Sequence, residues 1–179
     1  MKTRSLYAAA ALVAFAVSPL ANADSVSDKF RECRTGEGES AVAACTWYLN
    51  AGYNLSPQNK ALALMLRAQA HLGLKQLLGA LADYDAATQA QPRNPDAWYN
   101  HAVVASGMDK LEVAITDLDR VLELRPGWVP ALVARGAVHI AHGEPQKAIA
   151  DDTAALQLDP NNTQAQADLA LARQRLGKP

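Results

Sequence analysis

The sequence has no excess of positive charge and none of the short motifs that mark common catalytic sites. Its 17 Lys and Arg residues against 18 Asp and Glu residues give a formal net charge of −1 at pH 7. Nucleic acids and anionic membranes attract basic patches, so this balance argues against either as the main partner. No Ser/His/Asp triad order, no Gly-rich phosphate loop and no basic-aromatic patch occurs in the chain. We therefore expect a non-catalytic protein that needs no cofactor.

Long apolar runs are also scarce, and the only one lies at the N-terminus. Lys2 and Arg4 precede an apolar core at Leu6–Val17, which is too short to span a bilayer comfortably. The Ala-Asn-Ala sequence that follows fits a signal-peptidase site, so we predict a signal peptide over residues 1–23, cleaved before Asp24. The alternative is an uncleaved anchor helix. The short basic region is typical of bacteria, and we expect a periplasmic protein with no membrane insertion after cleavage.

Cysteine is limited to two residues, Cys33 and Cys45, with eleven residues between them. An even number of cysteines in an exported chain favours a disulfide. Such a bond would restrict the unfolded chain by roughly 3 kcal/mol in a loop-entropy treatment. A redox couple is the alternative, but a reactive pair usually has the closer Cys-x-x-Cys spacing. We predict a structural disulfide.

What the sequence has instead is an internal repeat with a period of 34 residues. Four columns of residues keep this interval: Pro92, Pro126 and Pro160; Ala80, Ala114 and Ala148; Asp83, Asp117 and Asp151; and Ala68, Ala102 and Gly136. Each period contains two stretches with apolar residues at helical spacing. A repeat of this length indicates stacked helical pairs, because one pair cannot bury its apolar face alone.

These features resemble the tetratricopeptide repeat family. The best copy spans residues 95–128, with Trp98 at the aromatic position, Ala102 at the small position and Pro126 closing the unit. The resemblance implies an all-α fold, a right-handed α-solenoid of helix-turn-helix units. The expected order is a degenerate, disulfide-stapled helical pair at 24–60, repeats at 61–94, 95–128 and 129–162, and a polar capping helix at 163–179.

In this family the first helices of the stacked pairs line a concave inner surface. Carrying over the family's groove positions gives four columns, most of them apolar: Leu62, Asp96 and Pro130; Met65, Tyr99 and Val133; Gln69, Val103 and Ala137; and Leu72, Ser106 and Ile140. An exposed apolar strip often marks a partner site. The resemblance therefore implies a groove for a peptide or helix of another protein. The alternatives are that the terminal helices cover much of the strip, or that the chain associates with itself through its end faces.

Some members of the family hold a C-terminal carboxylate with a clamp of Lys, Arg and Asn side chains. The clamp positions correspond here to Met65, Gln69, Asn100, Pro130 and Ala134. Only Asn100 fits, and it is retained in the predicted groove. Because a cationic clamp is absent, we do not expect the chain to capture an acidic tail by charge.

Three histidines define an alternative function, a small exported metal-handling protein or enzyme. His139 and His142 are three residues apart on one predicted helix, and His71 has the same repeat position as His139. A zinc site needs a third and a fourth ligand arranged with them, and no carboxylate stands at a standard spacing in that helix. A pocket that joins His71 and His139 to a carboxylate would favour this alternative. A continuous apolar groove would favour peptide binding.

Neighbouring aspartates recur in the second helix of every repeat. They are Asp83 and Asp85, Asp117 and Asp119, and Asp151 and Asp152. We interpret this periodic set as solvated outer-face residues rather than acid/base groups, which would need two carboxylates in one cleft. Asp152 differs, since its register matches Tyr84 and Leu118, two packing positions. A buried carboxylate needs a partner, so we predict an ion pair of Asp152 with Arg135 or Arg173.

Overall fold

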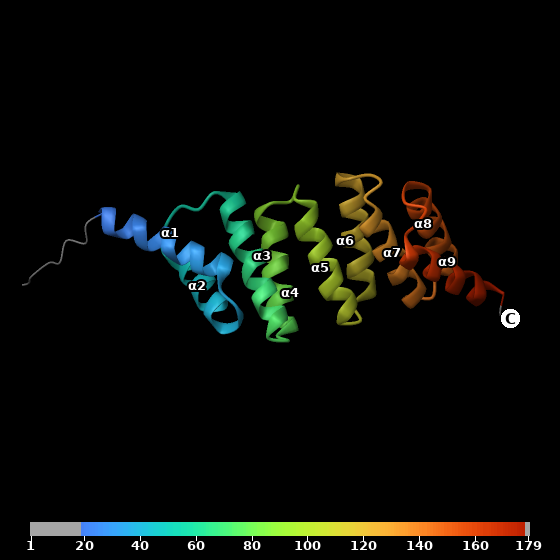
Figure 1. Cartoon of the computed structure of the whole chain (residues 1–179), viewed down its shortest axis with the longest axis horizontal. Coiled ribbons are helices and arrows are strands. Elements are labelled where there is room, and N and C mark those ends of the chain that lie inside the picture. Colours follow the sequence, from blue (N-terminus) through green and yellow to red (C-terminus); the bar gives the residue numbers. More distant parts are fainter. Residues whose placement is uncertain (1–18, 178–179) are drawn as a thin grey trace, which may run out of the picture.

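The computed structural model describes residues 19–177, which form nine α-helices and no strand. In chain order the helices are α1 (Pro19–Thr35), α2 (Gly38–Asn50), α3 (Pro57–Gly73), α4 (Leu77–Ala90), α5 (Pro95–Gly107), α6 (Leu111–Leu124), α7 (Val129–Ala141), α8 (Pro145–Leu158) and α9 (Thr163–Leu176). They stack in this order along a single row (Figure 1). The predicted all-α solenoid is confirmed, whereas residues 1–18 of the predicted signal peptide lie outside the described residues. Within the described part, no helix combines the length and the apolar character needed to cross a bilayer.

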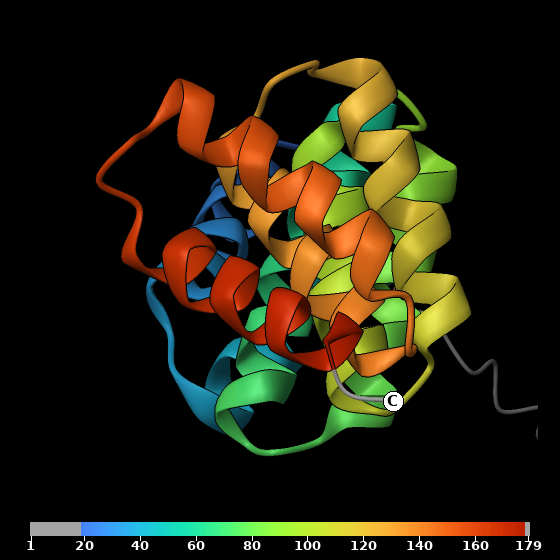
Figure 2. The same cartoon turned by 90° about the vertical axis from the view of Figure 1, so that its right-hand side faces the viewer.

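The helices are arranged as successive pairs. Each helix packs on the next one in the chain, and first helices of neighbouring pairs also touch: α1 contacts α3, α5 contacts α7, and α7 contacts α9. In the view from the C-terminal end of the row, the pairs lie one behind another (Figure 2). The first helices thus share one face of the row.

Helix starts follow the capping residues seen in the sequence. The Ser56 hydroxyl accepts a hydrogen bond from the amide three residues later, and the Asn94 side chain accepts one from the amide two residues later. A proline follows each of these caps at the first helical position, where its missing N–H is not needed. Asn162 caps α9 in the same way. Local sequence therefore places the starts of α3, α5 and α9.

The turn inside each repeat holds one residue in the left-handed backbone region. Lys75 and Asp109 both have φ of 59°, and Gly143 has φ of 82°. These three positions keep the 34-residue interval. Lys75 and Asp109 adopt this conformation against the steric preference of residues with a Cβ, while Gly143 does so without strain. The period therefore governs the backbone of the turns as well as the packing of the helices.

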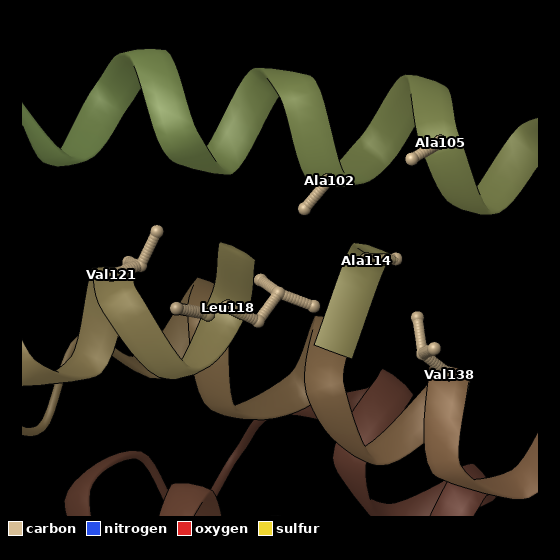
Figure 3. Packing of buried hydrophobic residues seen from close by; sticks show 7 residues of the cluster. Ala102, Ala105, Ala114, Leu118, Val121 and Val138 are labelled. Carbon is tan, nitrogen blue, oxygen red and sulfur yellow. The ribbon is translucent and has the colours of Figure 1, made fainter. Parts of the chain in front are cut away.

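The core between the helices is made largely of small side chains. Ala80, Ala114 and Ala148 have no exposed surface, and the largest buried cluster combines alanines with a few branched residues. Figure 3 shows Ala102 of α5 directed at Leu118 of α6. Small side chains on one helix allow the branched side chains of the next to approach closely, which gives the dense packing typical of protein interiors.

The N-terminal pair is joined by the predicted disulfide between Cys33 of α1 and Cys45 of α2. Both cysteines are buried, and the rings of Phe30 and Tyr48 stack beside them with centroids 4.7 Å apart. As described, α1 already includes Pro19 and so reaches back past the expected cleavage point before Asp24.

Candidate functional site: the concave face

An apolar hollow lies between α5 and α7 on the face shared by the first helices. Its volume is about 210 Å³. It is lined by Ala102, Val103, Ser106, Leu118, Ala134, Ala137 and Val138. Three of these, Val103, Ser106 and Ala137, belong to the predicted groove columns, and Val103 is 49% exposed. A large apolar side chain next to an apolar hollow is a surface that a partner's side chain can cover.

The predicted groove residues differ in exposure. Leu62 (42% exposed), Gln69, Asp96, Pro130 and Ala137 are exposed. Those of intermediate exposure are Met65, Leu72, Tyr99, Asn100, Ser106 and Val133. The strip is therefore accessible along α3, α5 and the first turns of α7. Whether a ligand occupies it stays a prediction.

The prediction that Ile140 lines the groove is wrong, because this residue is only 5% exposed. It packs in a cluster with Ala148 of α8 and Ala172 of α9. Its carbonyl oxygen also accepts a hydrogen bond from Arg175 Nη1 at 2.5 Å. Helix α9 stacks on α7 as the first helix of a further pair would, and it covers this end of the strip.

Helix α9 also adds a residue to the concave face that the sequence reasoning missed. Leu171 lies 34 residues after Ala137 and is 39% exposed. It continues the column formed by Gln69, Val103 and Ala137. The 34-residue interval contains this signal, which the interpretation of the helix as a polar cap does not use.

A second hollow of about 390 Å³ lies where the turn between α1 and α2 meets α3. It is lined by Cys33, Arg34, Gly36, Glu37, Gly38, Ala41, Leu66, Gln69, Ala70 and Gly73. Gln69 is the predicted groove residue that borders it. This end of the concave face is therefore more polar than the hollow between α5 and α7.

Tyr99 is held in position by a stack of side chains. Its ring centroid lies 4.9 Å from that of Trp128, and the Arg125 guanidinium lies 4.6 Å from the Trp128 ring on which it stacks. Arg125 also approaches Asp96 at 3.6 Å, so the charge of this groove residue is balanced. Such an arrangement provides a rigid aromatic contact with little net charge.

The comparison with known proteins decides the family. The profile of the tetratricopeptide repeat matches residues 95–127. The first tetratricopeptide domain of Spaghetti (RPAP3), solved with the HSP90 peptide SRMEEVD, is 28% identical, with a TM-score of 0.66 over 71% of this chain and 100% of that one. This chain is a tetratricopeptide repeat protein.

Two further comparisons set the extent of the similarity. The chain aligns with DnaJ homolog subfamily C member 3 of Rattus norvegicus at 33% identity over 93 residues. That alignment covers 52% of this chain but only 18% of the relative. The crystal structure of MamA shares the fold, with a TM-score of 0.77 over 87% of this chain and 84% of that one, at 18% identity.

Each tetratricopeptide repeat contains a pair, formed by a buried aspartate and a basic residue, that the sequence reasoning missed. Three aspartates expected in solvent, Asp83, Asp117 and Asp151, are only 4–6% exposed. Each pairs with the residue 16 positions earlier: Arg67, His101 and Arg135, respectively. The three basic residues themselves recur every 34 residues. This column of basic residues is the signal in the sequence that the aspartates face the neighbouring helix rather than water.

The Arg135 pair extends across two repeats. Its guanidinium bonds to both carboxyl oxygens of Asp151 and, through Nη1, to Asp119 of the preceding repeat. The hydrogen bond with Asp151 is the main cause that raises the pKa of Arg135, and the bond with Asp119 adds to it. Bidentate pairing of this kind compensates the loss of hydration on burial.

The histidines do not form the pocket required by the metal-handling alternative. His71 lies 3.7 Å from Asp83, whereas His139 lies 2.8 Å from Glu144, so each contacts an acid of its own repeat. His142 bonds to Glu112 at 3.1 Å, and this bond raises the pKa of His142. Within residues 19–177, no group of three His, Cys, Asp or Glu side chains is placed to hold a metal ion.

The predicted ion pair of Asp152 with Arg135 or Arg173 is wrong. Asp152 is indeed fully buried, but neither of its carboxyl oxygens has a hydrogen-bond partner among the described residues. Arg135 is occupied by Asp151 and Asp119, and Arg173 is exposed. Desolvation, then the charges of Asp168 and Asp151, raise the pKa of Asp152 to about 7.

Proposed function

We propose that this tetratricopeptide repeat protein binds an apolar segment of another protein along the concave face of α3, α5, α7 and α9. The observation that carries the proposal is the apolar hollow between α5 and α7, with Val103 half-exposed at its edge. Leu62 and Leu171 present further apolar surface on the first and last of these helices. Stacked helical repeats commonly use such concave surfaces for binding.

The composition of the groove supports an uncharged partner segment. The Spaghetti domain was solved with a peptide that ends in Glu-Glu-Val-Asp. In this chain, the clamp positions hold Met65, Gln69, Pro130 and Ala134, none of which carries a positive charge. The cations of the inner helices, Arg67 and Arg135, are already paired with aspartates. The partner segment is therefore apolar and is recognised without its C-terminal charge.

The proposed role is that of an adaptor or assembly factor for an envelope complex in the bacterial periplasm. The basic and apolar pattern at the N-terminus, followed by Ala-Asn-Ala, supports export. The disulfide between Cys33 and Cys45 also supports an oxidising compartment.

A pair of matched valine substitutions tests the groove. Val103→Glu places a charge at the apolar hollow, whereas Val113→Glu places one on α6, where Val113 is 41% exposed and lines none of the concave hollows. Peptides selected from a display library with the wild type serve as probes. We expect Val103→Glu to weaken their binding by roughly tenfold or more and Val113→Glu to leave it unchanged. Equal effects of the two substitutions would remove the groove assignment.

A further inference from the structure

The carboxyl group of Asp152 lies in the interior between the last repeat and α9. Its exposed fraction is 0%, and both of its oxygens lack hydrogen-bond partners within residues 19–177. Tyr84 and Leu118 occupy the same position in the first two repeats. A charged carboxylate at a site built for a large apolar or aromatic side chain is strongly disfavoured.

On the α7 side, Asp152 sits directly against the backbone of Gly136. A Cβ atom added to Gly136 would lie 2.6 Å from Asp152 Oδ1, so only glycine leaves room for the carboxyl group. No charged side chain of α7 compensates Asp152. Arg135 is bound to Asp151 and Asp119, and His139 contacts Glu144 and approaches Asp151 at 3.9 Å.

On the α9 side, the titratable group that most affects the pKa of Asp152 is another acid, Asp168. Asp168 is 8% exposed and accepts two hydrogen bonds from Gln164. Its charge, together with that of Asp151 on α8, disfavours the ionised form of Asp152. The cations of α9 are directed elsewhere: Arg173 is exposed, and Arg175 bonds to the Ile140 carbonyl.

We propose that α9 is a protonation-dependent latch, which stays docked while Asp152 is protonated and loosens when Asp152 ionises. Ionisation requires water at a site enclosed by α7, α8 and α9. Since α9 is the last helix within residues 19–177 and packs mainly on α7 and α8, its displacement is the least disruptive way to admit water. Loosening uncovers Ile140 and Ala172, and the concave strip then extends further along α7.

Amide hydrogen exchange on the full chain tests the latch, with protection factors corrected for the intrinsic pH dependence of exchange. We expect the protection of α9 to fall roughly tenfold or more between about pH 5 and about pH 9, while that of α5 and α6 stays constant. In Asp152→Asn, which keeps the side-chain shape but cannot ionise, α9 protection does not change with pH. Constant protection of α9 in the wild type, or an unchanged loss in Asp152→Asn, would overturn the proposal.

Two further variants separate the latch from general effects of charge. Asp168→Asn removes a negative charge that disfavours Asp152 ionisation, so the loss of protection shifts to lower pH. Asp85→Asn removes an exposed carboxylate on α4 and leaves the midpoint in place. A shift to higher pH in Asp168→Asn, or an equal shift in Asp85→Asn, contradicts the proposal even if Asp152→Asn does not fold.

Discussion

Arg135 binds Asp151 through two parallel hydrogen bonds, from Nε to Oδ2 at 2.9 Å and from Nη2 to Oδ1 at 2.6 Å. The same residue pair in the first repeat, Arg67 and Asp83, has the same bidentate geometry. The pairs connect the two helices of a repeat at a partly buried position. They therefore fix how the second helix lies against the first.

Removal of Arg135 is expected to destabilise the last repeat strongly. In Arg135→Met, Asp151 stays buried without its cation, which typically costs about 3 kcal/mol or more. The double substitution Arg135→Met with Asp151→Leu removes both charges and should recover most of the loss. Urea unfolding followed by circular dichroism measures both. A double variant no more stable than the single one would show that the pair is not the source of the effect.

Gly136→Ala is expected to destabilise the chain by about 1–3 kcal/mol, because the new methyl group would overlap the Asp152 carboxyl group. Gly107→Ala is the matched control at the end of α5, since no atom lies within 4 Å of the added Cβ. That variant should be neutral or slightly stabilising. Thermal unfolding of both proteins gives the comparison, and equal losses would contradict the proposed overlap.

The folded state is expected to lose stability as the pH rises from about 4 to about 7. The pKa of Asp152 is raised to about 7 from an ordinary value of 3.8. Between these values the folded chain holds a proton that the unfolded chain has released, so the free energy of unfolding decreases with rising pH and then levels off. The loss is at most about 4 kcal/mol.

Comparison with Asp152→Asn separates the contribution of Asp152 to the pH dependence of stability from that of the histidines. The difference in Tm between the wild type and Asp152→Asn, measured by calorimetry, should change in favour of the variant as the pH rises. A difference that is independent of pH would mean that Asp152 titrates equally in the folded and unfolded chains.

The wild-type chain is expected to bind the peptide SRMEEVD very weakly, because its clamp positions hold no cation. Introducing Met65→Lys, Pro130→Lys and Ala134→Arg should create binding, with Asn100 completing the site. Fluorescence anisotropy with the free-acid peptide measures the gain, and the C-terminally amidated peptide is the control. Equal binding of both peptide forms by the variant would show that no carboxylate clamp had been formed.

Much of the fold follows from local sequence, because capping residues, prolines and the 34-residue period act within one repeat. Ser56 and Asn94 mark helix starts that the structure reproduces. The period also identifies which positions face inward. It cannot show what the next helix covers, and for this reason Ile140 was assigned to the groove although α9 buries it.

The aspartates show a second limit of the sequence pattern. Asp151 and Asp152 are adjacent, so they point about 100° apart around α8. One meets Arg135 and the other meets the backbone of Gly136. The register predicts an ion pair for Asp152 and a solvated position for Asp151, but the packing of α7 against α8 places Asp151, not Asp152, against Arg135.

The Arg–Asp and His–Asp pairs of the three repeats have a consequence for how the chain folds. Each joins residues only 16 positions apart, and the disulfide joins residues 12 apart. Chains dominated by short sequence separations have low contact order and fold quickly, because little loop entropy is lost before contacts form. Each helical pair of this protein can thus close its own cross-link as it forms, before the rest of the row has assembled.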